Sequence, residues 1–420
     1  MTSIDISRVP RLPDRLAFTL AAAVIGLCLA ASAMPSPLYK LYAANWHLDT
    51  STVTLIYAIY CFGVLATLLL FGRVSDAVGR RPVIAAGLTG LLLSMLIFIN
   101  ATNVTWLFIA RAVQGLSTGI AISAAGAALL ELYRGENPAK AGLYNVVASG
   151  LGVGLGGMAG ALLVQYVADP LVTPFILLAV LVALLLGGSL LMPETMVSRT
   201  RFRFSAPGVP RRILGAFTLA GLGITCAWSI VGLFLGLVGA IAPALLHTTS
   251  YLPAGGSILA MGGAGAVASV YTQRVAPTDQ IAWGMAILST GIVGLALSVT
   301  RSGDALAFLF SAVVIGFGMG SGMFGAVRTI GAAAPADRRA QVMAAFYIVA
   351  YAAISLPAIA AGYTARHLGA AHTIQIFGAG IIVASLGTMT LAIARHRATA
   401  SKTIPATVGP RSTVSAVPQP

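Results

Sequence analysis

Residues 52–100 read TVTLIYAIYCFGVLATLLLFGRVSDAVGRRPVIAAGLTGLLLSMLIFIN. Two long apolar runs enclose a short polar loop, and each run has about the 20 residues that a helix needs to cross ~30 Å of hydrocarbon. Helices are expected because exposed backbone groups cannot stay unpaired in lipid. The stretch therefore predicts a helical hairpin that crosses a membrane twice.

The rest of the chain repeats this pattern of apolar runs and short gaps. We predict an all-α membrane protein with twelve transmembrane helices in two six-helix, pseudo-symmetric bundles. The predicted spans are 16–34, 52–71, 83–100, 105–131, 141–165, 173–192, 214–241, 256–273, 282–300, 305–331, 341–364 and 373–394.

The composition excludes an ordinary soluble protein. Hydrophobic residues make up 58% of the chain and charged residues only 9%, whereas soluble domains carry about 25% charged residues. All five histidines lie in gaps or in the tail, and Cys28, Cys61 and Cys226 form no CxxC pair. No GxxxxGK[ST] loop occurs. We therefore expect no metal, no cofactor, no direct use of ATP, no nucleic-acid partner and no enzymatic activity.

The basic residues predict the orientation in the membrane. With both chain ends on the cytoplasmic side, only Lys40, Arg301 and Arg366 of the 25 Lys and Arg residues fall outside, and Arg111 falls within a span. Basic loops stay in the cytoplasm. We expect a multi-pass protein of the inner (cytoplasmic) membrane with both termini cytoplasmic.

The longest gap between well-defined spans divides the chain into two sets of six. The predicted units are an N-terminal bundle at 1–192, a cytoplasmic linker at 193–213, a C-terminal bundle at 214–394 and a disordered cytoplasmic tail at 395–420. A shift of 201 residues aligns 72–74 with 273–275 and 112–115 with 313–316. A duplicated protein of this kind is expected to bind its substrate near the midplane, between the halves.

The loop between the second and third spans carries Gly72, Asp76, Gly79, Arg80 and Arg81. Asp76 suits a helix N-terminus, Gly79 suits a tight turn, and the arginines hold the loop in the cytoplasm. The alternative is a plain basic loop. The pattern closely resembles the signature loop of the major facilitator superfamily, G-x-x-x-D-x-x-G-R-[RK].

The resemblance implies the superfamily fold, alternating access and a small-molecule cargo. It also implies that Arg80 or Arg81 pairs with Glu131, at the cytoplasmic end of the fourth span. That pair is expected to latch the cytoplasmic side when the protein faces outward. Gly72, Asp76, Gly79, Arg80, Arg81 and Glu131 together form the predicted conformational switch.

The fourth span contains Arg111, Gln114 and Gly115, which resemble the second motif of the family, L-x-x-x-R-x-x-Q-G. A charge inside a span normally faces a cavity and has a functional partner. Gln114 shares the face of Arg111, so both are predicted to form a wall of the transport pathway. The alternative is an arginine that snorkels to the outer surface.

The fifth span is rich in glycine. Gly152 and Gly156-Gly157 are in register with the antiporter motif of the superfamily, but Val153 stands where that motif has proline. The departure weakens the case for antiport. Small residues that allow close helix packing explain the same pattern.

All 11 acidic residues lie outside the span interiors. A lipophilic cation would find no buried counter-charge, so we expect neutral or anionic cargo, with Arg111 as a candidate contact for an anion. The candidate substrate-binding residues are Tyr57, Tyr60, Asn145, Trp228, Tyr347 and Tyr351. Aromatic residues in spans also serve as plain packing or interface residues.

The sequence thus favours a secondary active transporter that moves a small organic solute by alternating access. Efflux is the leading direction, with proton coupling as one option, and the resemblance to the drug and sugar efflux branch is its basis. The alternatives are an importer or facilitator for sugars or organic anions and a non-transporting membrane receptor. The expected partners are the small-molecule substrate, protons in the coupled case and the lipid bilayer, and we expect a monomer.

Overall fold

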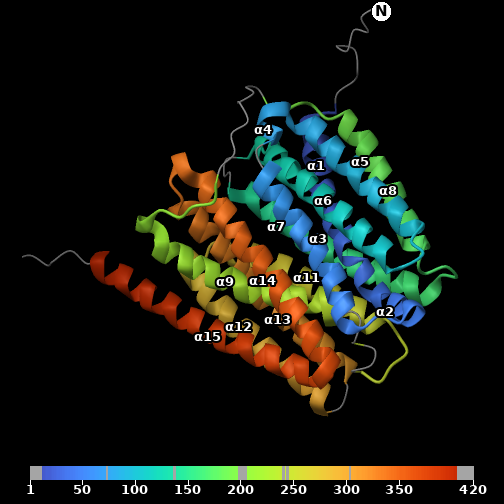
Figure 1. Ribbon diagram of the computed structural model, residues 1–420. Coiled ribbons are helices and arrows are strands. Elements are labelled where there is room, and N and C mark those ends of the chain that lie inside the picture. The colour runs from blue at the N-terminus through green and yellow to red at the C-terminus, as the bar shows by residue number, and fades with distance from the viewer. Residues whose placement is uncertain are drawn as a thin grey trace, which may run out of the picture.

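The computed structural model describes residues 12–71, 74–135, 139–196, 206–238, 242, 246–301 and 304–403. Within these ranges the chain forms helices and turns and no strand. It contains 12 helices long and apolar enough to cross a membrane. They form two bundles, one blue to green and one yellow to red in Figure 1. The predicted fold class is confirmed.

The first bundle begins with a broken span. Its two parts, α1 (Asp14–Ala33) and α2 (Pro35–Trp46), meet at Met34. Proline lacks the N–H that a continuous helix needs, so Pro35 and Pro37 explain the break. The other helices of this bundle are α3 (Thr50–Phe71), the short α4 (Val74–Val78), α5 (Arg80–Ile99), α6 (Val104–Leu132), α7 (Ala139–Tyr166) and α8 (Thr173–Leu190).

The second bundle begins with another irregular span. After a short turn, η2 (Arg211–Ile213), α9 (Leu214–Leu233) continues into a π-helical turn, η3 (Phe234–Val238). The remaining elements are α11 (Leu252–Thr272), α12 (Pro277–Arg301), α13 (Ala305–Ala333), η4 (Ala336–Arg338), α14 (Arg339–Leu368) and α15 (Ala370–Thr403).

Helix packing repeats between the halves. In the first bundle α5 packs on α6 and α8, α6 on α3 and α1, and α1 on α7. In the second bundle α12 packs on α13 and α15, α13 on α11 and α9, and α9 on α14. Each contact has its counterpart six spans further along the chain, as a duplication requires. The sequence offset is therefore matched by a repeated architecture.

Two helix pairs join the halves: α7 with α11, and α3 with α14. Glycines set the distance at the first pair. A Cβ at Gly262 would overlap the carbonyl oxygen of Gly150, and a Cβ at Gly150 would lie 2.8 Å from the carbonyl oxygen of Gly262. Only glycine allows the two backbones to approach so closely. The glycine-rich fifth span therefore packs against the other half of the molecule.

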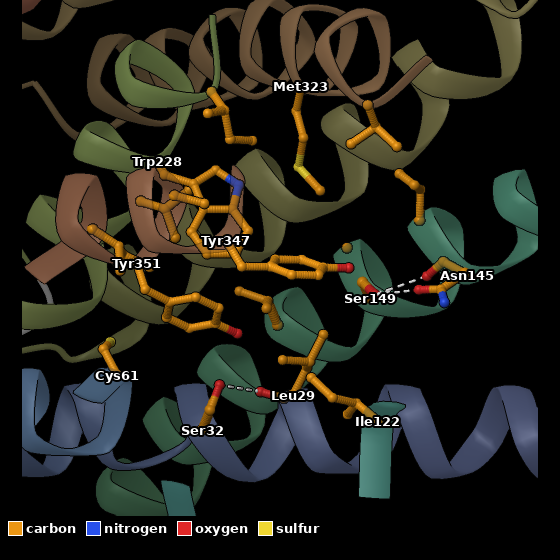
Figure 2. Close-up of a pocket in the computed structure, with 18 of the residues that line it drawn as sticks. Leu29, Ser32, Cys61, Ile122, Asn145, Ser149, Trp228, Met323, Tyr347 and Tyr351 are labelled. Carbon is orange, nitrogen blue, oxygen red and sulfur yellow. Dashed lines mark hydrogen bonds between the residues drawn. The ribbon is translucent and has the colours of Figure 1, made fainter. Parts of the chain in front are cut away.

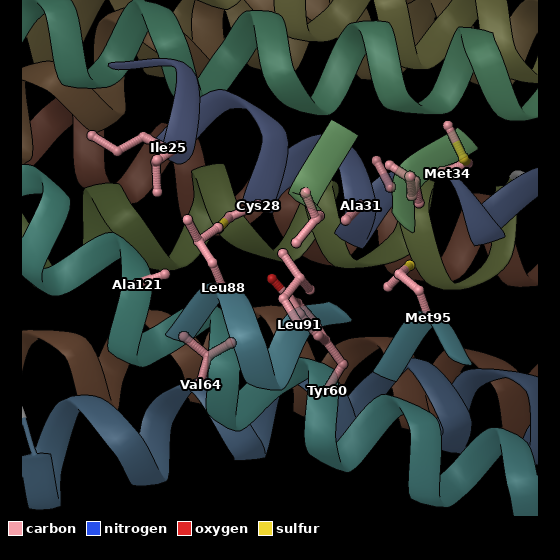
Figure 3. Packing of buried hydrophobic residues seen from close by; sticks show 14 of the residues in the cluster. Ile25, Cys28, Ala31, Met34, Tyr60, Val64, Leu88, Leu91, Met95 and Ala121 are labelled. Carbon is pink, nitrogen blue, oxygen red and sulfur yellow. The ribbon is translucent and has the colours of Figure 1, made fainter. Parts of the chain in front are cut away.

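Each bundle has its own apolar core. In the first, Ile25, Cys28 and Ala31 of α1 lie in one buried cluster with Leu88 and Leu91 of α5 (Figure 3). A separate cluster is centred on α9, α12 and α13. The packing of each half is thus largely self-contained, so each half is suited to move as a unit.

The predicted tail needs one correction. Helix α15 continues to Thr403, beyond the predicted boundary at 394, because 394–400 contains several alanines, which favour helix. His396 Nδ1 also lies 2.9 Å from Asp279 Oδ1 of α12. The rest of the predicted tail lies outside the described residues, as do 197–205 of the predicted linker.

Candidate functional site

A cavity of about 580 Å³ lies between the two halves. It is lined by α1, α3, α6 and α7 of the first bundle and by α9, α11, α13 and α14 of the second. Figure 2 shows side chains from both bundles meeting across it. This is where a duplicated transporter is expected to hold its cargo.

The six predicted substrate-binding residues all line this cavity. Tyr57 and Tyr60 come from α3, with ring centroids 6.4 Å apart, and Asn145 comes from α7. On the opposite side Trp228 of α9 meets Tyr351 of α14 edge to face, with centroids 5.0 Å apart. Tyr347 lies one turn before Tyr351 on α14 and points toward Ser149 and Asn145 (Figure 2).

The lining is aromatic, apolar and uncharged. Of the described residues that line the cavity, none is Asp, Glu, Lys, Arg or His. Polar atoms come from the tyrosines, from Trp228 and Asn145, and from the hydroxyls of Ser32, Ser123 and Ser149. Such a surface suits uncharged molecules, and its described residues offer no counter-charge to an ion.

Arg111 and Gln114 do not line the cavity, which corrects their predicted place in its wall. Both are 0% exposed, so the snorkelling alternative also fails. They lie behind Ser32 and Tyr60, which do line the cavity. Arg111 Nη1 donates to the Ser32 carbonyl at 3.1 Å, and its Cζ lies 5.5 Å from the centroid of the Tyr60 ring.

The break in the first span explains this placement. Pro35 has no N–H, so the carbonyl four residues earlier, on Ala31, loses its helical partner. Gln114 Nε2 donates to that carbonyl at 2.9 Å. Arg111 Nη1 donates to Gln114 Oε1 at 2.6 Å, and Arg111 Nη2 donates to the Tyr39 hydroxyl at 2.6 Å. Arg111 and Gln114 therefore hold the kink between α1 and α2 in place.

Gly115 is fixed by packing. A Cβ there would overlap the carbonyl oxygen of Tyr60. The glycine thus allows α6 to lie directly against the cavity-lining part of α3. It supports the site and does not line it.

The structure brings the charges of the signature loop together around Arg80. Arg80 Nη1 lies 2.6 Å from Asp76 Oδ1 and also donates to Ser75 Oγ at 2.6 Å. Arg80 Nη2 lies 2.8 Å from Glu131 Oε1, across from α5 to α6. Arg80 is 6% exposed. We call Asp76, Arg80 and Glu131 the charge cluster; Gly72 lies outside the described residues.

Glu194 joins the charge cluster to the linker, and sequence reasoning missed it. Its Oε1 accepts the Arg80 N–H at 2.8 Å and its Oε2 accepts the Arg81 N–H at 3.2 Å, so it caps the start of α5. Gly79, with φ +119°, makes the turn that leaves room for this carboxylate. Thr195 donates to Glu131. The available signal was an acid directly after the sixth span, since carboxylates favour helix N-termini.

The cavity opens toward the end that carries the charge cluster. Its lining reaches Leu70 near the end of α3, Gly142 near the start of α7 and Met343 near the start of α14. These helix ends share that side, and we call it the loop side. The lining stops near Ser32 and Leu235 in the other direction.

Contacts between the halves close the opposite end, which we call the closed side. Ser36 Oγ donates to the Leu235 carbonyl at 2.8 Å. Arg366 Nη1 lies 3.0 Å from Asp49 Oδ2. The Tyr251 N–H donates to Gln165 Oε1 at 3.0 Å. The conformation is therefore open on the loop side only.

This conformation bears on the predicted role of the Arg80–Glu131 pair. Both residues belong to the first bundle, and the pair is formed while the loop side is open. It cannot by itself hold the two halves together. Here the pair braces α5 against α6 within one half. The latch predicted for the outward-facing state concerns the other conformation and stays a prediction.

Comparison with known proteins identifies the class. The family model of the Major Facilitator Superfamily matches residues 20–358, so the chain belongs to this superfamily of membrane transporters. Two solved structures share the fold. The human organic anion transporter MFSD10 has a TM-score of 0.66 at 16% identity, covering 91% of this chain and 100% of that one. A POT family transporter in complex with 5-aminolevulinic acid has a TM-score of 0.70 at 13% identity, covering 90% and 96%.

Several curated relatives are resistance proteins. The puromycin resistance protein pur8 of Streptomyces alboniger is 39% identical over 28% of this chain and 24% of its own length. The multidrug resistance protein MdtM of Salmonella typhimurium is 31% identical over 41% of each chain. The class C tetracycline resistance protein of Escherichia coli is 33% identical over 45% of this chain and 46% of its own. The match spans less than half of each of these relatives.

Proposed function

We propose that this protein is a secondary transporter that exports small, uncharged organic molecules by alternating access. The observation that carries the proposal is the uncharged cavity between the halves, open on the loop side and closed on the other. Rocking the bundles about their α7–α11 and α3–α14 contacts would close the first side and open the second.

The direction rests on charge and on the relatives. We propose that the loop side is cytoplasmic, because basic residues gather in its gaps. In this conformation the cavity would then load from the cytoplasm. The resistance proteins among the relatives support efflux. Import of a sugar or organic anion is the runner-up.

The site bears on two open points, the charge of the cargo and the coupling to protons. Arg111 is engaged by Tyr39, Gln114 and the Ser32 carbonyl behind the cavity lining, which favours neutral over anionic cargo. Among the described residues, the lining also supplies no carboxylate to carry a proton. We therefore propose that proton exchange, where it drives export, uses groups outside the cavity wall. We propose a monomer that transports and does not catalyse.

Transport direction tests the proposal. Cells that produce the protein should accumulate less of a neutral exported compound than cells with the empty vector. Candidate compounds are first chosen by ligand-dependent thermal shift of the purified protein. Proteoliposomes loaded with the unlabelled compound should then show counterflow of the labelled one. Higher accumulation in cells would support import, and counterflow absent for every stabilising compound would overturn transport.

A proton readout separates the coupling modes. Inside-out vesicles with an imposed pH gradient should take up the compound faster when their lumen is acidic if exchange with protons drives export. Equal rates with and without the gradient would leave the transporter proposal intact and remove the coupling.

A further inference from the structure

We propose that the cavity selects planar, uncharged aromatic compounds that carry hydrogen-bond acceptors such as carbonyl oxygens. This inference names the cargo class of the proposed transporter and rests on that function for its biological meaning. Trp228, Tyr347, Tyr351 and Asn145 are the residues that would impose the selection.

The cavity holds donors that the protein leaves unpaired. Within the described part of the chain, no protein atom accepts a hydrogen bond from Trp228 Nε1, Tyr347 Oη, Tyr351 Oη or Asn145 Nδ2; the amide of Asn145 serves only as an acceptor, for Ser149 Oγ at 3.4 Å. An indole N–H can only donate, and a phenol hydroxyl donates readily. All four unpaired atoms can therefore donate; Trp228 Nε1 and Asn145 Nδ2 can only donate, whereas the two tyrosine hydroxyls can also accept.

These donors converge. The hydroxyls of Tyr347 and Tyr351 point away from α14 into the cavity, and the indole nitrogen of Trp228 points into the same space (Figure 2). Asn145 lies on the opposite wall, on α7. In the open cavity water can satisfy them. A cargo that displaces this water must supply acceptors, because a site built of donors rejects a molecule that leaves them unpaired.

The walls between the donors suit a flat ring. Trp228 and Tyr351 stand edge to face, at 81°, and Tyr57 and Tyr60 present further rings from the other half. Aromatic pairs prefer offset-stacked or edge-to-face arrangements. Met261, Met319 and Met323 fill the second bundle's side with side chains that adapt to irregular outlines. Rings from both halves could therefore enclose one planar molecule.

The electrostatics disfavour a cation. The described lining has no acid, and Arg111 lies behind it, with its Cζ 5.5 Å from the centroid of the Tyr60 ring. A buried guanidinium behind the wall raises the potential in the cavity. An aromatic cation could stack on these rings but would meet this potential without a counter-charge.

Three probes of similar shape test the inference. Anthraquinone is planar and neutral with two carbonyl acceptors, anthracene has the same ring outline without them, and N-methylacridinium is a planar cation. Binding is measured by equilibrium dialysis of the purified protein in detergent, with protein-free micelles as the partition blank. We expect anthraquinone to bind about tenfold more tightly than either other probe.

Variants that remove single donors locate the effect. Trp228→Phe keeps a ring and removes the N–H, while Tyr347→Phe and Tyr351→Phe remove only a hydroxyl. Each should weaken anthraquinone about three- to tenfold and leave anthracene within about twofold. The matched control is Tyr363→Phe on the same helix α14, which is 62% exposed and faces away from the cavity. Melting temperatures show that each variant is folded.

Equal binding of anthraquinone and anthracene, or equal losses for both in the donor variants, would overturn the inference. Tighter binding of N-methylacridinium would overturn it as well. These results are independent of the export assay: a failed preference leaves counterflow of other compounds intact, and failed export leaves the binding preference measurable.

Discussion

In each half, the start of the third span (α5 or α12) is tied to the end of the fourth span (α6 or α13) at one corner of the bundle. The interaction that forms this tie differs between the halves. In the first half the tie is ionic: Arg80 at the start of α5 binds Glu131 at the end of α6, at 2.8 Å. In the second half the arginine is on the other helix. Arg328, near the end of α13, donates to Gln280 Oε1 of α12 at 2.7 Å and to the Val275 carbonyl at 2.8 Å.

The difference shows that the corner needs a tie but not an ion pair. Gln280, a neutral residue, also donates to the Thr272 carbonyl at 2.8 Å, so one amide joins α11, α12 and α13. In the second half the fold is therefore served by an arginine that binds neutral groups only. The two acids around Arg80, and Glu194 beside them, exceed what the fold alone requires. We infer that the charges of the first half bias the conformational change.

A second asymmetry lies deeper in the membrane. The repeat offset of 201 residues places Arg111 opposite Ala312 and Gln114 opposite Ile315. The first span of each half is nevertheless broken, by prolines at the junction of α1 and α2 and by a π-helical turn after α9. Ser36 of the first break donates to Leu235 of the second. Only the proline break needs an arginine and a glutamine, because proline frees carbonyls that a π-turn can still pair.

The largest effect is expected for Arg111→Ala. The variant leaves the Ser32 carbonyl, the Tyr39 hydroxyl and Gln114 Oε1 without their donor in a fully buried region. Unpaired buried groups cost about 1–3 kcal/mol each, so we expect a markedly lower melting temperature and no transport. Arg111→Lys should restore little, because lysine lacks the planar fork.

A matched variant in the other half is Ala312→Leu, which perturbs the equivalent site without removing a donor. Melting temperature and counterflow are measured for Arg111→Ala, Arg111→Lys and Ala312→Leu and compared with those of the wild-type protein. Arg111→Ala with wild-type melting and transport would show that the kink holds without its brace, and the asymmetry would then carry no structural meaning.

The next effect compares the two corners directly. Arg80→Ala leaves Asp76 and Glu131 close together without their shared cation, whereas Arg328→Ala leaves only a neutral amide and a carbonyl without a donor. Like charges repel, so we expect Arg80→Ala to reduce counterflow about tenfold or more and Arg328→Ala about threefold or less. Equal losses would show that both ties serve only the fold.

The charge of Asp76 separates switching from folding. Asp76→Asn keeps the shape and a hydrogen-bond acceptor for Arg80, and Arg80 retains Glu131. We expect the free energy of unfolding to change by less than about 1 kcal/mol, so the melting temperature should change little. Transport should fall severalfold. Counterflow at the wild-type rate, with normal expression, would show that the charge does not bias the conformers.

Much of this fold could be predicted from the sequence because lipid imposes simple rules. Span lengths and basic gaps follow from hydropathy and charge. The duplication follows from the two sets of six spans and the matches at one offset of 201 residues. The six cavity residues could be named as candidates because they carry polar or aromatic tips within spans, although such residues also serve in packing and at the membrane interface. The role of Glu194 and the position of Arg111 behind the cavity lining could not be predicted. Both depend on which backbone groups are left unpaired by a distant helix end or by a proline.

The smallest effect concerns the closed side, where Asp49 and Arg366 join the halves. The Ser51 hydroxyl and the Thr52 N–H donate to Asp49, at 2.7 Å each, and they lower the pKa of that carboxyl to about 2. A depressed pKa means that the contribution of the pair is present above the unfolded value of about 3.9 and is lost only as the pH falls through about 2. The pair should therefore be constant across physiological pH, unlike a contact that uses histidine.

The probe for this prediction is Thr54→Cys, at a position that is 0% exposed and packs beside Gly362 of the other half. A membrane-impermeant maleimide can reach a cysteine there only when the closed side opens. Exposed ion pairs contribute little, so Asp49→Asn in this background should raise the labelling rate by about twofold or less. The rise should be the same at about pH 5, 7 and 9, because the carboxylate stays ionised throughout. A rise confined to the higher pH values would place a titrating group in this contact, and the closed side would then be pH-gated.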